Sequence, residues 1–150
     1  MSGILPNTLA RRGSFAFEDL PQGTEFEQQY VITPELYEKF LDLFGDTSPL
    51  HVSDEVARSC GFPAKLMHGA ILNGFISNFV GMNFPGKRAL ELGMEIQFVK
   101  PTYAGDVLML HARVQERLES RRVVVLQFRF LRDRVAVARG RVSVMICEIE

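Results

Sequence analysis

Four segments in the second half of the chain carry apolar residues at every second position. The first has Leu90, Leu92, Met94, Ile96 and Phe98 at even positions, with Glu91, Glu95 and Gln97 between them. The same alternation recurs in residues 108–114, 124–130 and 136–146. A period of two places the apolar side chains on one face of a β-strand. The sequence therefore predicts four long strands, each with one buried and one wet face.

Short turns separate these four segments. They contain Gly105-Asp106, Ser120 with its charged neighbours, and Asp133 between two arginines. Antiparallel sheets are the ones that can leave a whole face in water. We therefore expect an antiparallel meander, in which each strand pairs with the next one along the chain.

A strongly apolar helix is predicted between Gly69 and Gly81. Its apolar residues recur at offsets of one and four and comprise Ile71, Leu72, Phe75, Ile76, Phe79 and Val80. They cover more than half of the helix circumference, which indicates a buried helix. The apolar face of the sheet is the natural place for it. The expected fold class is α+β, a hot-dog fold in which an antiparallel sheet wraps around a central helix.

The first half of the chain predicts shorter elements. Residues 24–32 form a candidate first strand. A helix over 34–44 is predicted from Thr33-Pro34 at its start and from an apolar face made by Leu36, Tyr37, Phe40, Leu41 and Phe44. Gly45 ends this helix, residues 45–51 are expected to form a loop, and Ser53 starts a second short helix that ends by Gly61.

The length of 150 residues suits a single domain. Residues 1–22 mix glycine, proline, polar and charged residues without periodicity. We expect them to form an N-terminal extension that is loose or drapes over a single globular domain, residues 23–150.

Charge and cysteine content exclude several classes of protein. The chain has 17 Lys and Arg against 18 Asp and Glu, so no general field attracts nucleic acid or an anionic membrane surface. Cys60 and Cys147 have no zinc-like or redox spacing. No apolar run of signal-peptide or membrane length follows the N-terminus, and we expect a cytoplasmic protein with neither nucleic-acid nor membrane partners.

Asp46 and His51 are the candidate catalytic pair. They lie five residues apart around Pro49 in the segment after the first helix. A turn can bring a carboxylate and an imidazole to one side, where the carboxylate fixes the imidazole tautomer and the two groups handle a water molecule. A helix-capping Asp beside a surface His is the alternative interpretation of this spacing.

Three separated motifs resemble the MaoC-like, R-specific enoyl-CoA hydratase family of hot-dog proteins. They are Gly-Asp-Thr-Ser-Pro-Leu-His at 45–51, Met-His-Gly-Ala at 67–70 and Pro-Thr-Tyr-Ala-Gly-Asp at 101–106. The family signature is a Gly-Asp-x-Asn-Pro-x-His loop, a His-Gly helix start and a later Pro-x-x-x-Gly-Asp turn. The resemblance covers about 24–147. It implies that Asp46 and His51 activate a water molecule for addition to a trans-2-enoyl thioester.

Gly69 is the candidate donor to the thioester carbonyl. A residue that begins a helix has an unpaired backbone N–H, and a glycine lets a substrate approach closely. Addition of water at C3 builds negative charge on the thioester oxygen, which such a donor stabilises. The resemblance implies this role for Gly69. Alternatively, the glycine only lets the helix start beneath a neighbouring strand.

Three further residues are candidates for substrate contact. Ser48 stands where the family has Asn, which could weaken the loop geometry or a substrate contact. His68 precedes Gly69 and could shape the turn into the buried helix. Ser77 matches a serine that lines the site in the family, although a helical Ser often bonds its own backbone. No ligand spacing indicates a metal site.

The leading hypothesis is reversible hydration of trans-2-enoyl-CoA to (R)-3-hydroxyacyl-CoA, without a cofactor other than the coenzyme A thioester substrate. Rival enzymatic hypotheses are an (R)-3-hydroxyacyl-carrier-protein dehydratase and a hot-dog acyl-CoA thioesterase. A non-catalytic acyl-CoA-binding protein is the rival from another class. Free sheet edges and the resemblance together predict a homodimer or a higher even oligomer.

Overall fold

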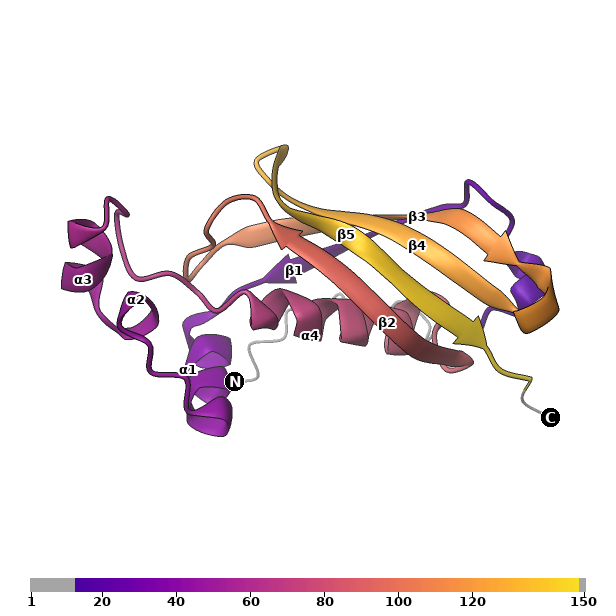
Figure 1. The fold of residues 1–150 in the computed structure, drawn as a ribbon, viewed down its shortest axis with the longest axis horizontal. Helices are drawn as coiled ribbons and strands as arrows, with labels where there is room; N and C mark the ends of the chain where they lie inside the picture. Colours follow the sequence, from indigo (N-terminus) through magenta and orange to yellow (C-terminus); the bar gives the residue numbers. More distant parts are fainter. Residues whose placement is uncertain (1–12, 149–150) are drawn as a thin grey trace.

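A computed structural model describes residues 13–148 (Figure 1). The helices are α1 (Pro34–Phe44), α2 (Pro49–Val52), α3 (Asp54–Ser59) and α4 (Ala70–Asn78), with short helical segments η1 (Phe17–Asp19), η2 (Phe79–Asn83) and η3 (Glu119–Arg121). The strands are β1 (Glu25–Val31), β2 (Ala89–Phe98), β3 (Val107–Leu118), β4 (Val123–Arg132) and β5 (Val135–Ile146). The predicted α+β class is confirmed.

One antiparallel sheet holds all five strands in the order β1-β3-β4-β5-β2. The prediction of a simple meander is wrong, because β2 pairs with β5 and not with β3. Tight turns join β3 to β4 and β4 to β5, and Asp133 and Arg134 both adopt positive φ in the second turn, as a two-residue hairpin requires. Residues 99–106 are long enough to carry the chain from β2 at one edge to β3.

The helix α4 lies against the concave face of this sheet (Figure 1). Its buried side chains, with those of η2, are Ile71, Leu72, Ile76, Phe79 and Val80. They pack against the predicted inward-facing residues of β3 and β4. On that face, every second residue from Leu108 to Val114 is at most 4% exposed, and every second residue from Val124 to Phe130 is at most 2% exposed. The hot-dog arrangement predicted from the apolar patterns is confirmed. Truncating one of these large side chains to alanine should cost about 2–5 kcal/mol.

The strand β2 departs from its predicted burial. Leu90, Leu92 and Phe98 are 48%, 54% and 51% exposed, whereas Met94 and Ile96 are partly buried. The strand lies at the sheet edge, and its pairing with β5 shifts register between Glu91 and Gly93. A register shift of this kind turns the bulged residue away from the ladder. The edge strand therefore presents apolar side chains that residues 13–148 do not cover.

The predicted limits of α1 are confirmed. The Thr33 hydroxyl accepts a hydrogen bond from the Leu36 N–H at 3.0 Å, and Pro34 occupies the first turn. Gly45 ends the helix at φ 65°. Beyond one end of the sheet, α1, α2 and α3 gather near the start of α4 (Figure 1). No helix in residues 13–148 has the length and apolar character needed to cross a membrane.

The N-terminal segment packs against the domain where the structure describes it. Phe17 and Leu20 are 2% and 0% exposed in the core, and Ser14 pairs with Gly86 in an isolated bridge. This agrees with an extension that drapes over the domain. Residues 1–12 lie outside the described part, and the boundary at residue 22 stays a prediction.

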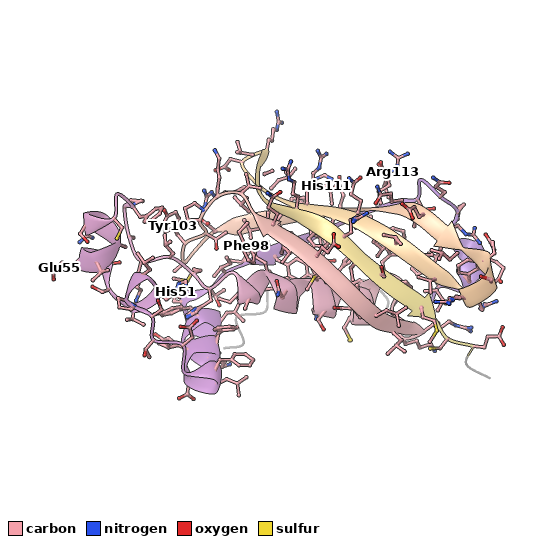
Figure 2. All side chains as sticks on the ribbon, viewed as in Figure 1. His51, Glu55, Phe98, Tyr103, His111 and Arg113 are labelled. Atoms are coloured by element: carbon pink, nitrogen blue, oxygen red, sulfur yellow. The ribbon has the colours of Figure 1, made fainter. Side chains whose placement is uncertain are left out.

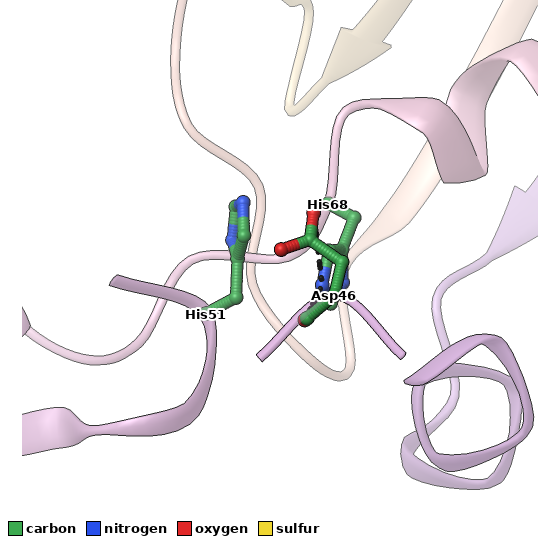
Figure 3. Close-up of side chains that lie close together, drawn as sticks. All are labelled: Asp46, His51 and His68. Carbon is green, nitrogen blue, oxygen red and sulfur yellow. Dashed lines mark hydrogen bonds and ion pairs between the residues drawn. The ribbon is translucent and has the colours of Figure 1, made fainter. Parts of the chain in front are cut away.

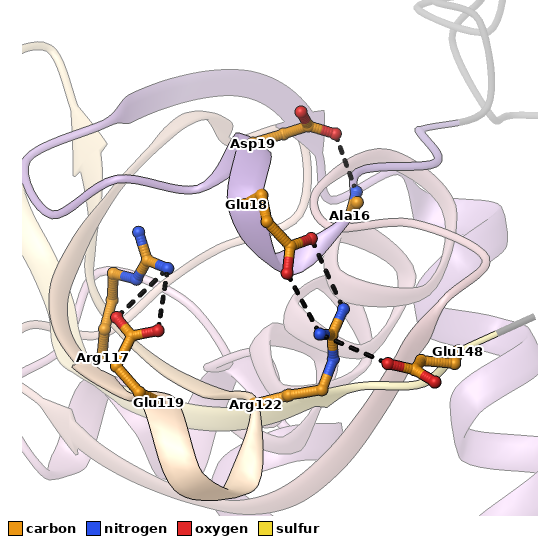
Figure 4. A network of polar contacts seen from close by, with 7 residues as sticks. All are labelled: Ala16, Glu18, Asp19, Arg117, Glu119, Arg122 and Glu148. Carbon is orange, nitrogen blue, oxygen red and sulfur yellow. Dashed lines mark hydrogen bonds and ion pairs between the residues drawn. The ribbon is translucent and has the colours of Figure 1, made fainter.

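An arginine network joins this segment to the β3–β4 connection and to Glu148 beyond β5 (Figure 4). The Arg122 guanidinium lies 3.0 Å from the Glu18 carboxylate and 3.4 Å from that of Glu148. The Arg117 and Arg122 guanidinium groups also lie over the Phe17 ring, at 4.3 and 5.5 Å from its centroid. A backbone N–H donor and the Arg122 guanidinium lower the pKa of Glu18 from its ordinary value.

We expect the Glu18→Gln variant to melt below the wild type at neutral pH. The pKa of Glu18 is lower in the folded chain than in the unfolded chain, so the stabilisation is present above the ordinary pKa and is lost as the pH falls through the folded value. The difference in Tm should therefore close as the pH is lowered from about 7 to about 3. Glu38→Gln on the exposed side of α1 is the matched control. An equal difference at every pH would contradict the ion-pair explanation.

Candidate active site

Three side chains from separate segments meet at the end of the sheet where α4 begins (Figure 3). Asp46 follows α1, His51 belongs to α2, and His68 precedes α4. One carboxylate or ring-nitrogen atom of each residue lies within 4.8 Å of the corresponding atoms of the other two. The structure thus brings together the two residues that the sequence pairs, and adds a third.

Asp46 lies in the short connection between α1 and α2. The left-handed Gly45 lets the chain leave α1, and the Gly45 N–H donates to the Leu41 carbonyl at 2.8 Å. The Asp46 Oδ1 accepts a hydrogen bond from the Ser48 N–H at 3.2 Å, which folds the connection into an Asx turn. The side chain is 52% exposed, and one carboxylate oxygen points toward the His51 ring (Figure 3). The carboxylate is therefore oriented by the loop and open to an incoming water molecule.

His51 lies in a short helix, so the prediction of a loop over residues 45–51 is wrong at its end. Pro49 starts α2, since its fixed φ suits the first helical position. The His51 Nδ1 lies 2.8 Å from the Leu66 carbonyl oxygen. A carbonyl only accepts hydrogen bonds, so Nδ1 carries a proton. In the neutral form of the ring this leaves the lone pair on Nε2, which is the tautomer that a base at Nε2 requires.

The main chain of His51 is held as well as its ring. The Tyr37 hydroxyl donates a hydrogen bond to the His51 carbonyl at 2.8 Å, and the Leu66 N–H donates to the carbonyl of Leu50 at 2.8 Å. Sequence reasoning placed Tyr37 on the apolar face of its helix and missed this second contact. The feature that could have predicted this contact is the position of Tyr37 on the buried face, since a buried tyrosine hydroxyl usually has a hydrogen-bond partner.

His68 is 2% exposed and packs among aromatic rings. Its ring centroid lies 4.1 Å from that of His51, 4.7 Å from that of Phe40 and 5.9 Å from that of Tyr37. Its Nε2 lies 2.8 Å from the Asp46 carbonyl oxygen and 3.8 Å from Asp46 Oδ2. Only the first distance is that of a hydrogen bond. His68 therefore contacts the main chain of Asp46, and its predicted contact with substrate stays a prediction.

Gly69 is the residue before the first turn of α4. Its N–H donates no hydrogen bond within residues 13–148. A Cβ at this position would lie 2.6 Å from the Phe98 ring, which extends from the end of β2 (Figure 2). Both interpretations of this glycine therefore have a structural basis: a free donor at the helix start, and close packing beneath a neighbouring strand.

The two candidate serines differ in position. Ser48 contacts Asp46 through its main-chain N–H, and its side chain makes no capping bond to α2. Ser77 lies on the exposed side of α4, two turns beyond Gly69, and its hydroxyl makes no hydrogen bond to another described residue. The structure does not bring Ser77 into contact with Asp46 or His51. A substrate role for either serine stays a prediction.

A partly buried ion pair anchors the connection that passes beside Met67. The Asp106 carboxylate pairs with Arg132 at the end of β4 and accepts a hydrogen bond from the Tyr103 N–H at 2.9 Å. Arg132 also donates to the Pro101 carbonyl at 3.1 Å. In the same connection, the Thr102 carbonyl accepts a hydrogen bond from the Met67 N–H at 2.8 Å. Sequence reasoning assigned Gly105-Asp106 to a turn between two strands and missed this ion pair.

The three side chains also have the spacing of metal ligands. Two of their four ring nitrogens already face main-chain carbonyls, His51 Nδ1 at Leu66 and His68 Nε2 at Asp46. Only His51 Nε2 and the buried His68 Nδ1 remain for a cation, beside one carboxylate. The prediction from the sequence that the reaction uses no metal therefore stays a prediction.

Comparison with known proteins agrees with this geometry. The profile of the MaoC-like domain matches residues 17–130. An (R)-specific enoyl-CoA hydratase of Rhodospirillum rubrum is 26% identical over 87% of this chain and 90% of its own length. A 3-hydroxybutyryl-CoA dehydratase of Methylorubrum extorquens is 30% identical over 71% of this chain and 68% of its own.

Solved structures share the fold. The (R)-hydratase of Aeromonas caviae involved in PHA biosynthesis superimposes with a TM-score of 0.79 at 23% identity, covering 86% of this chain and 98% of its own. The unliganded R-hydratase of Pseudomonas aeruginosa gives 0.80 at 25% identity, covering 89% and 86%. The profile match spans most of the chain and includes the loop of Asp46 and His51, so the resemblance inferred from the sequence is confirmed and the chain belongs to the MaoC-like dehydratase family.

Proposed function

We propose that this protein catalyses the reversible hydration of trans-2-enoyl-CoA to (R)-3-hydroxyacyl-CoA. One observation carries the proposal: the Asp46 carboxylate and the His51 ring, whose Nδ1 donates to the Leu66 carbonyl, lie together at the start of α4, where the Gly69 N–H has no hydrogen-bond partner within residues 13–148. The R. rubrum and M. extorquens relatives, named for hydration and dehydration of acyl-CoA, support the substrate class.

The chemistry divides between the loop and the helix start. One member of the Asp46 and His51 pair takes a proton from water while the water oxygen bonds to C3 of the enoyl thioester. The C2=C3 electrons move toward the thioester oxygen, where the Gly69 N–H stabilises the developing charge. C2 then receives a proton from the acid of the pair, so one water molecule has been added across the double bond. A carboxylate oxygen of Asp46 and a ring nitrogen of His51 lie within 4.8 Å of each other. One water molecule can bridge two polar atoms up to about 5.6 Å apart, so this pair can bind the attacking water between them.

The proposal assigns proton removal and proton delivery to the Asp46 and His51 pair as a whole. The reaction as proposed uses only proton transfer and carbonyl polarisation. We infer that it requires no metal and no cofactor beyond the coenzyme A of the substrate. A cytoplasmic location also stays a prediction, and the two unpaired cysteines support it.

Asp46→Asn and His51→Ala should each lower the hydration rate by at least about a hundredfold, because general acid–base catalysis contributes about 10²- to 10⁴-fold. The assay follows the loss of enoyl thioester absorbance with crotonyl-CoA and longer enoyl-CoAs. His111→Ala is the matched control, since His111 pairs with Glu27 on the outer face of the sheet and should leave the rate unchanged (Figure 2). A near-wild-type rate in either site variant, with an unchanged melting temperature, would remove this mechanism.

The same assay separates the rival functions. A thioesterase would release free thiol from acyl-CoA, which a thiol reagent detects and a hydratase does not produce. A carrier-protein dehydratase would turn over the enoyl-carrier-protein substrate and leave enoyl-CoA unchanged. Retention of the absorbance with every chain length and both carriers would favour a non-catalytic acyl-binding protein.

Gly69→Ala should lower kcat by about tenfold to a hundredfold, the scale of a displacement of about 1 Å in a reacting group. The added Cβ collides with the Phe98 ring and blocks approach to the N–H. The double variant Gly69→Ala, Phe98→Ala keeps the added Cβ next to the N–H but removes its collision with the Phe98 ring. If it remains slow relative to Phe98→Ala, the donor interpretation of Gly69 holds. Full recovery would instead mean that the glycine serves only packing beneath β2.

We also propose that the protein forms a homodimer or a higher even oligomer through the β2 edge. Among the residues that the structure describes, β2 pairs with β5 alone, and its edge exposes Leu90, Leu92, Phe98 and the adjacent Val99. An exposed apolar edge strand favours pairing with another chain. An isologous contact would cover the same edge in both copies.

Light scattering at micromolar concentration should give at least twice the 17.0 kDa mass of one chain. Leu92→Arg places a charge in the proposed contact and should shift the protein toward the monomer. The matched control Leu118→Arg alters a residue with similar exposure at the end of β3, and its mass should not change. A wild-type mass of one chain would refute the oligomer.

A further inference from the structure

Three consecutive residues before α4 each contact a different part of the candidate site. The Leu66 carbonyl accepts from the His51 ring, the Met67 N–H donates to Thr102, and the His68 ring faces the Asp46 carbonyl. Gly69 follows directly. Residues 66–68, which we call the hub segment, therefore connect both proton-transfer residues to the start of the central helix.

The His68 contact is the one that fixes Asp46 to the hub segment. Because a carbonyl cannot donate, the proton of this hydrogen bond belongs to His68 Nε2. The bond at 2.8 Å reaches the main chain of Asp46. The Asp46 side chain is half exposed, and within residues 13–148 the Ser48 N–H at 3.2 Å is its one hydrogen-bond partner. The loop that carries the carboxylate thus depends on His68 for its position relative to α4.

The other ring nitrogen argues against a packing role alone. His68 Nδ1 is buried and has no hydrogen-bond partner within the described chain. Leaving a buried polar atom unpaired is unfavourable, and a phenylalanine would fill the same space among Phe40, Tyr37 and His51 without that cost. The Nε2–H bond is the function that a histidine supplies here and an apolar ring does not.

We infer that His68 is a positioning residue that sets the Asp46 carboxylate at a fixed distance from His51 and from the Gly69 N–H. This rests on the proposed hydratase function. It gives His68 a role through the main chain of Asp46, in place of the predicted contact with substrate. A shift of about 1 Å between these groups is enough to cost about a hundredfold in rate.

The test compares two replacements that separate the hydrogen bond from the packing. His68→Phe keeps an aromatic ring and loses the donor, whereas His68→Gln keeps an N–H donor and loses the ring. We expect His68→Phe to lower kcat by about tenfold to a hundredfold, with KM changed by less than about threefold, because the lost interaction acts on the reacting groups and not on binding. His68→Gln should recover most of kcat.

A packing role predicts the opposite order, with His68→Phe close to the wild type and His68→Gln impaired. That result would overturn the inference, as would a loss of activity in both variants with equal loss of melting temperature. His111→Phe and His111→Gln are the matched controls on the outer face of the sheet, where both should retain kcat.

A second readout does not depend on activity. Amide hydrogen exchange at Thr47 and Ser48, whose N–H groups bond within the Asp46 loop, should be faster in His68→Phe than in the wild type or in His68→Gln. If the wild type fails to hydrate any enoyl thioester, the proposed function fails, and this exchange measurement still decides whether His68 positions the loop. Unchanged exchange in His68→Phe would overturn the inference in either case.

Discussion

The packing of α4 against one face of the sheet is the constraint on which the rest of the structure depends. Five large side chains of α4 and η2 are at most 3% exposed, and they meet strands whose inward residues are equally buried. Because the helix cannot slide along such a close-packed face, its first residue is fixed at one end of the sheet. The candidate carbonyl donor, Gly69, thus takes its position from the core. The acid–base residues lie outside that core and need a separate means of attachment.

Main-chain contacts provide that attachment. The Asp106 and Arg132 pair holds the β2–β3 connection to the end of β4, and Thr102 in this connection binds Met67 of the hub segment. The hub segment then binds the His51 ring and the Asp46 carbonyl. An ion pair that is mostly buried contributes little net stability, since desolvation opposes its attraction, but it does select one geometry. The Gly105-Asp106 turn is far from Asp46 in the sequence, but this series of contacts connects it to the Asp46 loop.

The sequence predicted those features that depend on local pattern. Alternation identified the inward faces of β3 and β4 and that of β5 from Ala138 onward, and capping signals identified both ends of α1. The alternation predicted for the start of β5 is wrong, because Val137 is 0% exposed and the pairing with β4 shifts register there. Sheet order was not predictable, because the alternation in β2 is the same whether it pairs with β3 or β5. Exposure of Leu92 and Phe98 follows from that edge position. For the site, spacing indicated Asp46 and His51, whereas the His68 contact escaped prediction because its acceptor is a carbonyl, which every residue has.

The replacement of the family Asn by Ser48 can now be assessed from its contacts. The bond that orients the Asp46 carboxylate comes from the Ser48 main-chain N–H, and the Ser48 hydroxyl makes no capping bond to α2. Any residue other than proline supplies that N–H. The Asx turn is therefore independent of the side chain at position 48, and so is the start of α2 at Pro49. An effect of the serine must act outside the loop, on a ligand or a neighbouring chain, and the geometry of Asp46 and His51 does not depend on it.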